Sequence, residues 1–101
     1  MGMTDCGIEK TIKIIGKKWS FLILRDLFEG HKRFGELLDS LSGISSKTLA
    51  IRLKELEKNK IIKKKIYKEI PLHVEYSLTE RGLSLKDILN DLRCWGENLN
   101  K

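Results

Sequence analysis

Lysine and arginine are the residue types in this sequence that most clearly point to a binding chemistry, and they are concentrated in one quarter of it. The segment 44–68 holds nine Lys or Arg residues and two Glu, a net charge of +7, whereas the other 76 residues together carry −1. Positive side chains gathered in one segment are typical of a surface that binds a polyanion such as nucleic acid. A solvated lysine-rich helix and hairpin would have the same composition, and the charge count does not separate the two.

The other reactive side chains do not form a catalytic or metal-binding set. Cys6, Cys94, His31 and His73 show no Cys-x-x-Cys or His-x-x-x-His spacing, so we expect no zinc site and no disulfide framework. We also find no paired carboxylates, Ser/His/Asp set or phosphate-binding loop. The sequence therefore predicts a protein that is not an enzyme and that uses no cofactor.

The length and composition indicate one folded domain. The 101 residues are 41% hydrophobic and 34% charged and include one proline, which suits a globular protein. The longest aliphatic or aromatic run, Phe21 to Leu24, is far shorter than the roughly 20 apolar residues of a membrane span. Residues 1–18 do not resemble a signal peptide, so we expect a cytoplasmic protein with no membrane contact.

Apolar spacing predicts three helices before residue 41. Ile8, Ile12, Ile15 and Trp19 are spaced as on one helical face, and the first helix is expected to end at Gly16, because glycine tolerates a left-handed cap. The second helix is expected from residue 17 or 18 through 28, and the third from about 33 to 40. All three would bury one apolar side.

A turn and a fourth helix follow. Ser45 is a plausible N-cap, without a capping box because Thr48 stands where Glu or Gln would be needed. From residue 46 to about 59, Leu49, Leu53 and Leu56 form an apolar stripe. At about 100 degrees per residue, the opposite face carries Lys47, Ile51, Lys54 and Lys58.

The last third of the chain predicts a hairpin and a final helix. Two β-rich runs, 61–67 and 73–78, flank the proline and read as a two-stranded hairpin. Within 83–100, apolar residues repeat at spacing 3-4-3-4, which suits a seam against another helix. These residues are Leu85, Ile88, Leu92, Trp95 and Leu99.

The order of elements is helix, helix, helix, turn, helix, two-stranded wing, helix. This order predicts a mainly α fold with a small β-hairpin, a winged helix-turn-helix, in one domain spanning 1–101. The helix-turn-helix would cover about 31–59 and the wing 61–78, with terminal helices at 5–19 and 83–100. Such a motif places its second helix in the major groove of double-stranded DNA, and basic strands beside it meet phosphates.

Candidate DNA contacts lie on the fourth helix and the wing. Ile51 would touch a thymine methyl group, whereas Ser46 and Thr48 have helix capping as their alternative role. For Arg52, an ion pair with Glu36 or Glu55 competes evenly with a phosphate contact. The candidates are Ser46, Lys47, Thr48, Ile51, Arg52, Lys54, Lys63, Lys64, Lys65, Lys68 and His73. An alternative reading is a winged-helix module whose basic face binds an acidic protein instead of DNA.

Several short motifs, in order, resemble the HxlR-type winged helix-turn-helix regulators of bacteria. They are Gly16-Lys-Lys-Trp19, Ile23-Leu-Arg-Asp-Leu27, Arg33-Phe-Gly-Glu-Leu37, Gly43-Ile-Ser45, Arg52-Leu-Lys-Glu-Leu56 and Val74-Glu-Tyr-Ser-Leu-Thr-Glu80. The resemblance covers nearly the whole chain from Cys6 to Gly96. It implies a homodimeric transcription factor whose terminal helices form the interface, here through Ile8, Ile12, Leu85, Ile88, Leu92, Trp95 and Leu99.

The resemblance also implies a candidate sensor and shows two departures. In part of the family, a cysteine at the position of Cys6 senses oxidants, quinones or aldehydes. Cys6 is near the start of the first helix with Lys10 one turn on, and both features favour the reactive thiolate. The family commonly has Cys-Pro where this chain has Cys6-Gly7, and Pro-Arg where it has Leu72-His73. The missing arginine shifts the expected wing contacts to the lysines.

Overall fold

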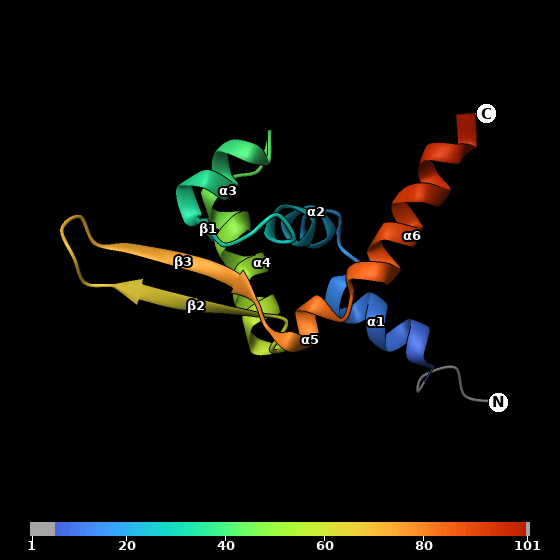
Figure 1. The fold of residues 1–101 in the computed structure, drawn as a ribbon, viewed down its shortest axis with the longest axis horizontal. Coiled ribbons are helices and arrows are strands. Elements are labelled where there is room, and N and C mark those ends of the chain that lie inside the picture. Colours follow the sequence, from blue (N-terminus) through green and yellow to red (C-terminus); the bar gives the residue numbers. More distant parts are fainter. Residues whose placement is uncertain (1–5, 101) are drawn as a thin grey trace.

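The structure, a computed structural model, describes residues 6–100 and has a helix-turn-helix at its centre, a wing at one end and a projecting helix at the other (Figure 1). The predicted first segment begins at residue 5, which lies outside the described residues. The elements are α1 (Gly7–Ile15), α2 (Lys18–Leu27), β1 (Lys32–Arg33), α3 (Phe34–Ser40), α4 (Ser46–Lys58), β2 (Ile62–Tyr67), β3 (His73–Leu78), α5 (Glu80–Leu83), α6 (Lys86–Glu97) and a 3-10 turn (Asn98–Asn100). The predicted winged helix-turn-helix is confirmed.

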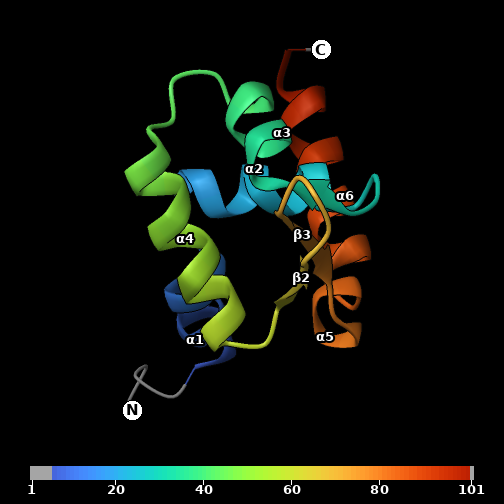
Figure 2. The same cartoon turned by 90° about the vertical axis from the view of Figure 1, so that its left-hand side faces the viewer.

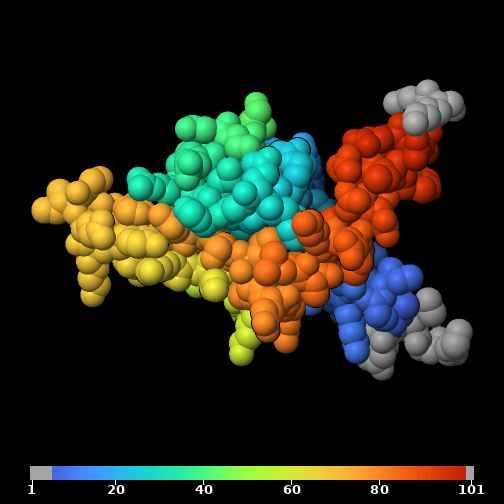
Figure 3. Space-filling model, in the orientation of Figure 1, coloured from blue at the N-terminus to red at the C-terminus, as the bar shows by residue number. Residues whose placement is uncertain are grey.

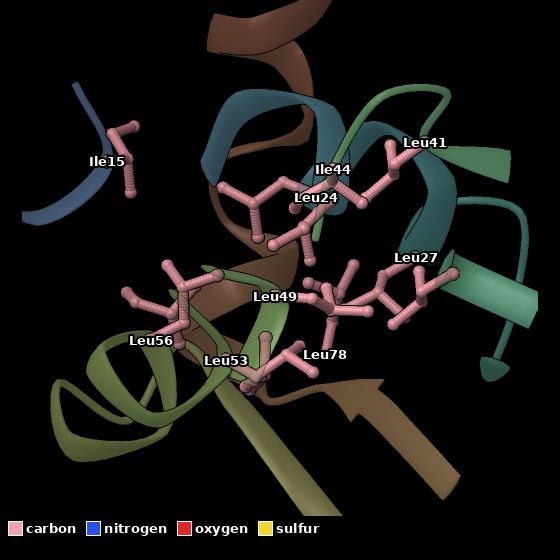
Figure 4. Packing of buried hydrophobic residues seen from close by; sticks show 13 residues of the cluster. Ile15, Leu24, Leu27, Leu41, Ile44, Leu49, Leu53, Leu56 and Leu78 are labelled. Carbon is pink, nitrogen blue, oxygen red and sulfur yellow. The ribbon is translucent and has the colours of Figure 1, made fainter. Parts of the chain in front are cut away.

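The core lies where α2, α3 and α4 meet the base of the sheet. Leu49, Leu53 and Leu56 are buried, as their spacing predicts. Figure 4 shows their side chains converging with those of Leu24 and Leu27 from α2. The buried apolar cluster comprises Ile15, Ile23, Leu24, Leu27, Leu37, Leu41, Ile44, Leu49, Leu53, Leu56, Ile61, Ile62 and Leu78.

The turn between α3 and α4 depends on two small residues. Gly43 has φ of +93°, a conformation that side-chain-bearing residues rarely adopt. Ser45 then caps α4, since its hydroxyl oxygen accepts a hydrogen bond of 3.0 Å from the amide of Thr48. The predicted N-cap is confirmed.

The wing has a strand that the sequence analysis does not predict. The sheet has three antiparallel strands in the order β1-β3-β2, and β1 pairs Lys32 with Tyr76. Residue 33 is therefore extended, and α3 begins at Phe34, one residue later than expected. The two long strands pair in register from Ile62 opposite Leu78 to Tyr67 opposite His73. The predicted two-stranded hairpin is thus the larger part of a three-stranded sheet.

Two details of the helix ends differ from expectation. The first helix ends before Gly16, but this residue has φ of −77°, so the left-handed cap is wrong. The amide of Gly16 instead donates to the carbonyl of Ile12 at 2.8 Å, as in a further helical turn. The expected helix over 83–100 is divided, because Thr79 caps the separate short helix α5 through the amide of Gly82. The helix α6 begins three residues beyond Leu83.

The helix α6 projects away from the body of the molecule. None of its residues is buried, and in Figure 3 it stands apart at the end opposite the wing. Figure 2 looks along the wing and shows α4 on one side of it and α6 on the other. The basic helix and wing are thus separated from the projecting terminal helix.

Candidate nucleic-acid interface

The outer face of α4 is basic and open. Lys47, Lys54 and Lys58 are all exposed, and Ile51 between them has 45% of its surface exposed. Within the described residues, no carboxylate lies within 4 Å of these three lysine ammonium groups. The burial of the leucine stripe turns this face outward. The face therefore offers three uncompensated positive charges around an apolar side chain.

The hydroxyl residues at the start of α4 differ in their surroundings. Ser46 is exposed, whereas Thr48 is half-buried and its hydroxyl oxygen accepts a hydrogen bond from Ser45 at 3.0 Å. The hydroxyl of Thr48 thus takes part in the cap of its own helix. Ser46 and Lys47 are the two exposed candidates in this first turn.

Arg52 lies in an ion-pair network at the side of α4. Its guanidinium donates to the carboxylate of Glu55, which also accepts from the ammonium of Lys17 at 3.2 Å. The network joins α4 to the start of α2. The structure forms the ion pair with Glu55 that the sequence analysis weighs against a phosphate contact, and it forms no pair with Glu36. The carboxylate of Glu36 instead accepts from the amide of Arg33 at 2.8 Å.

The ion pairs shift the ionisation of Glu55. The hydrogen bond from Lys17, followed by that from Arg52, lowers the pKa of Glu55 below its usual value of 4.5. Burial raises the pKa of Tyr76, and the charge of Glu57 adds to this effect. Tyr76 is therefore a neutral phenol at neutral pH, opposite Lys64 in the sheet.

The register of the sheet places the wing lysines on two faces. Lys63 and Lys65 share one face with Tyr67, and the ammonium of Lys65 lies 4.9 Å from the ring centre of Tyr67. Lys64 points to the other face, where its ammonium lies 4.0 Å from a carboxylate oxygen of Glu57 on α4. All three lysines are exposed, as is Lys68 in the loop after β2.

His73 is held by its neighbours at the end of the wing. Its ring stacks on that of Tyr67 with 4.6 Å between centroids, and its Nε2 lies 3.3 Å from an oxygen of Glu75. The other oxygen of Glu75 lies 3.7 Å from His31. With 17% of its side chain exposed, His73 is less available to a ligand than the lysines around it.

The loop at the tip of the wing exposes apolar residues that the sequence analysis does not single out. Ile70 is fully exposed, and Leu72 is 69% exposed. Large aliphatic residues on both sides of the proline are the signal that marks them in the sequence. Their exposure becomes evident only when the hairpin is seen to project beyond the core.

The residues expected at a dimer interface fall on two helices. Ile8 and Ile12 are exposed on α1, and Ile88, Leu92, Trp95 and Leu99 are exposed on α6 and the turn after it. Leu85 differs from the rest, because it is half-buried and packs against the core. Cys6 precedes α1 and is half-buried; its carbonyl oxygen accepts from the amide of Lys10 at 3.0 Å.

Among residues 6–100, no three His, Cys, Asp or Glu side chains gather into a group able to hold a metal ion. None of the helices in this part of the chain combines the length and apolar character needed to cross a bilayer.

A helix-turn-helix with a basic second helix beside a lysine-rich wing defines a winged helix-turn-helix protein. Residues 14–101 match the HxlR-like helix-turn-helix family, and the chain belongs to this family.

Named relatives in this family are transcriptional regulators. The HTH-type transcriptional regulator sll1512 of Synechocystis is 49% identical over 84 residues, which are 83% of this chain and 62% of that protein. The chain thus spans less than two thirds of this relative. The HTH-type transcriptional regulator YodB of Bacillus subtilis is 40% identical over 98 residues, 96% of this chain and 88% of YodB.

Solved structures share the fold over nearly the whole chain. The oxidized form of the redox regulator HypR has a TM-score of 0.86 and 37% identity, covering 91% of this chain and 95% of that one. Diamide-treated YodB has a TM-score of 0.79 and 37% identity, covering 97% of both chains.

The network around Glu55 gives a prediction about stability and pH. Because the pKa of Glu55 is lowered by folding, its stabilising effect is present above pH 4.5 and is lost as pH falls through the lowered value. Replacement Glu55→Gln should lower the free energy of unfolding by about 0.2–1 kcal/mol at pH 7, the range of exposed ion pairs. Urea unfolding at pH 7 and pH 3.5 measures this, and the difference from the wild type should shrink at the lower pH.

Glu69→Gln is the matched control for this prediction. Glu69 is exposed in the wing loop and, within residues 6–100, no cation lies within 4 Å of it. Its substitution should leave the unfolding free energy unchanged at both pH values. Equal stability of Glu55→Gln and the wild type at pH 7 would contradict a stabilising role for the network.

Proposed function

We propose that this protein is a homodimeric, sequence-specific DNA-binding transcriptional regulator that acts on a roughly palindromic operator. The observation that carries the proposal is the exposed, uncompensated basic face of α4 beside the lysine-rich wing. Membership of the HxlR-like family supports it.

The dimensions of α4 suit the major groove. A helix is about 10–12 Å across with its side chains, and the major groove is about 12 Å wide. Lys47 and Ser46, in the first turn, would reach base edges or phosphates, and Ile51 would meet a thymine methyl group. Lys54 and Lys58, further along the same face, would contact the phosphate backbone. Base contacts would then give sequence preference, and phosphate contacts affinity.

The apolar faces of the terminal helices support the proposed dimer. The helix α6 is amphipathic, but only Leu89 at its start packs against the core, and Trp95 is 69% exposed. A contiguous set of exposed large apolar side chains is typical of an interface between proteins. A second copy of the chain, related by a two-fold axis, would cover the exposed apolar residues of α1 and α6 in both subunits. This dimer would present two copies of α4 about 34 Å apart to a palindromic site.

The cysteine before α1 supports a redox-responsive version of this function. YodB and HypR, which are similar to this chain, have structures described as diamide-treated and oxidized. Cys6 is a free, half-buried cysteine directly before α1. We propose that oxidation or alkylation of Cys6 alters DNA affinity.

DNA binding is tested with duplexes from upstream of the protein's own gene and its neighbours. Lys54→Ala should weaken binding several-fold at fixed salt and make the slope of log K against log salt less negative by about 1 per DNA-bound subunit, because fewer counterions are released. For the wild type, the slope of log K against log salt should be about −5 to −9 if six to ten phosphates are neutralised. Titrations by fluorescence anisotropy at several salt concentrations provide both quantities.

Lys86→Ala serves as the control in these titrations. Lys86 is an exposed lysine at the start of α6, away from α4 and the wing (Figure 1). Its substitution removes the same charge and should leave affinity and slope unchanged. If the wild-type protein binds no duplex at low salt, the protein-interaction alternative is favoured and DNA regulation is rejected.

The dimer is tested by placing a charge on the apolar face of α6. Trp95→Glu should convert the dimer to a monomer, because a carboxylate buried at the interface would lack a partner. Analytical ultracentrifugation at micromolar concentration gives the mass. Ile66→Glu is the control, since Ile66 is a similarly exposed apolar residue on the wing, and this variant should remain dimeric. A wild-type chain that sediments as a monomer would refute the proposed interface.

The sensing role of Cys6 is tested with diamide or a quinone. Treatment should change the DNA affinity of the wild type and of Cys94→Ser, but not that of Cys6→Ser. The change is measured by anisotropy before treatment, after treatment and after reduction with dithiothreitol. If Cys6→Ser responds to the same extent as the wild type, Cys6 is not the sensor.

A further inference from the structure

The tip of the wing exposes two large aliphatic side chains. The loop between β2 and β3 covers residues 68–72, and within it Ile70 is 100% exposed and Leu72 is 69% exposed. The last strand pair before the loop is Tyr67 and His73, and the exposed Lys68 and Glu69 precede Ile70 in the loop itself. An aliphatic side chain held fully in water at the end of a projection has no role in the protein's own core.

The position of the tip restricts what can cover it. Figures 1 and 3 show the wing and α6 at opposite ends of a molecule that is 53 Å long. The exposed apolar residues of α1 and α6, which we assign to the dimer, are therefore far from the tip. A second copy bound at that seam would not bury Ile70, so another partner is required.

Side-chain contacts hold the tip in place at the end of the strands. Tyr67 and His73 form the last pair of the ladder, and their rings stack almost in parallel, with 11° between their planes. A carboxylate oxygen of Glu75 lies 3.3 Å from His73 Nε2, and the ammonium of Lys65 lies over the ring of Tyr67. The loop is thus attached to a fixed platform, which lowers the entropic cost of inserting it into a partner.

The length of the wing matches the spacing of the grooves of DNA. The strand β2 starts soon after α4 and runs for six residues. At about 3.3 Å per residue it carries the tip roughly 17–20 Å from the end of α4. In B-form DNA, one turn is about 34 Å, so a neighbouring minor groove lies about 17 Å from the centre of the major groove. A wing of this length reaches that minor groove when α4 is in the major groove.

We infer that Ile70 and Leu72 enter the minor groove beside each recognition helix and act as an apolar wedge that bends the duplex. This inference rests on the proposed function. The exposed isoleucine and leucine would provide the apolar contact at the tip. Lysines 63, 65 and 68 would bind the phosphates on either side of the wedge.

The physical chemistry of the groove explains why this contact bends DNA. The minor groove is only about 6 Å wide, so branched aliphatic side chains enter it fully only when it widens. Apolar side chains that enter this groove partly unstack a base step and kink the duplex toward the major groove. Pyrimidine–purine steps such as TA and CA deform most easily. The wedge would therefore select a flexible step beside each half-site without any hydrogen bond to a base.

The test uses a duplex selected from a random library by the wild-type protein. Ile70→Ala should weaken binding to it about five- to ten-fold, since most of the inserted apolar surface is lost. The salt dependence of binding should stay unchanged, because no phosphate contact is removed, whereas Lys68→Ala should reduce the salt slope by about 1 per bound subunit. Energy transfer between dyes at the duplex ends should show a smaller bend with Ile70→Ala.

Two controls and one DNA change make the test specific. Ile70→Leu should keep both affinity and bend, and Ile66→Ala, an apolar truncation on the strand, should change neither. Replacing the flexible step under the wing with a stiff A-tract should weaken binding of the wild type but not of Ile70→Ala. If a duplex is selected yet Ile70→Ala binds and bends it as the wild type does, the wedge is refuted and DNA binding stands. If no duplex is selected, the proposed function fails, and the wedge with it.

Discussion

The burial of one leucine stripe on α4 is the constraint on which the rest of the structure depends. Leu49, Leu53 and Leu56 are fully packed against α2 and the base of the sheet. Because successive helical residues are about 100 degrees apart, burying this stripe leaves only one orientation for the other side chains. Lys47, Ile51, Lys54 and Lys58 therefore point outward, and within residues 6–100 none of the three lysines forms an ion pair. The packing of the core thus determines the binding face.

A second constraint ties the wing to α4. The hydroxyl of Thr79 donates to the carbonyl oxygen of Lys60 at 2.6 Å, and the backbone amide of Thr79 donates to the carbonyl oxygen of Ile61 at 3.1 Å. Gly82 lies so close that a β-carbon there would overlap the same Ile61 carbonyl oxygen. The end of α4, the start of β2 and the helix α5 therefore meet in one tight junction. This junction sets the direction of the wing relative to the helix that it accompanies.

The local patterns of the sequence predicted the helices, the Ser45 cap and the hairpin, because each depends on neighbours a few residues apart. Partners distant in sequence were not predictable in the same way. The strand β1 exists only because residues 32 and 33 lie beside β3, more than forty residues later. Three consecutive lysines also contain no alternation of apolar and polar residues, so only the observed register shows that Lys64 faces away from Lys63 and Lys65. For Arg52, the sequence favoured an ion pair and a phosphate contact equally. In the structure Glu55 lies beside Arg52, and the two form the ion pair.

The basic surface and the exposed apolar surface lie at opposite ends of the molecule, and this separation bears on how two copies could associate. The end of the molecule with α4 and the wing repels a second copy of itself, because both carry excess positive charge, and the opposite end exposes apolar side chains on α1 and α6. The proposed self-association at the apolar end would therefore leave both basic ends free. Joining two such subunits doubles the number of phosphates neutralised in one binding event. In the proposed dimer, the basic surface of one 101-residue chain would thereby become a salt-sensitive, two-site surface without any additional residue.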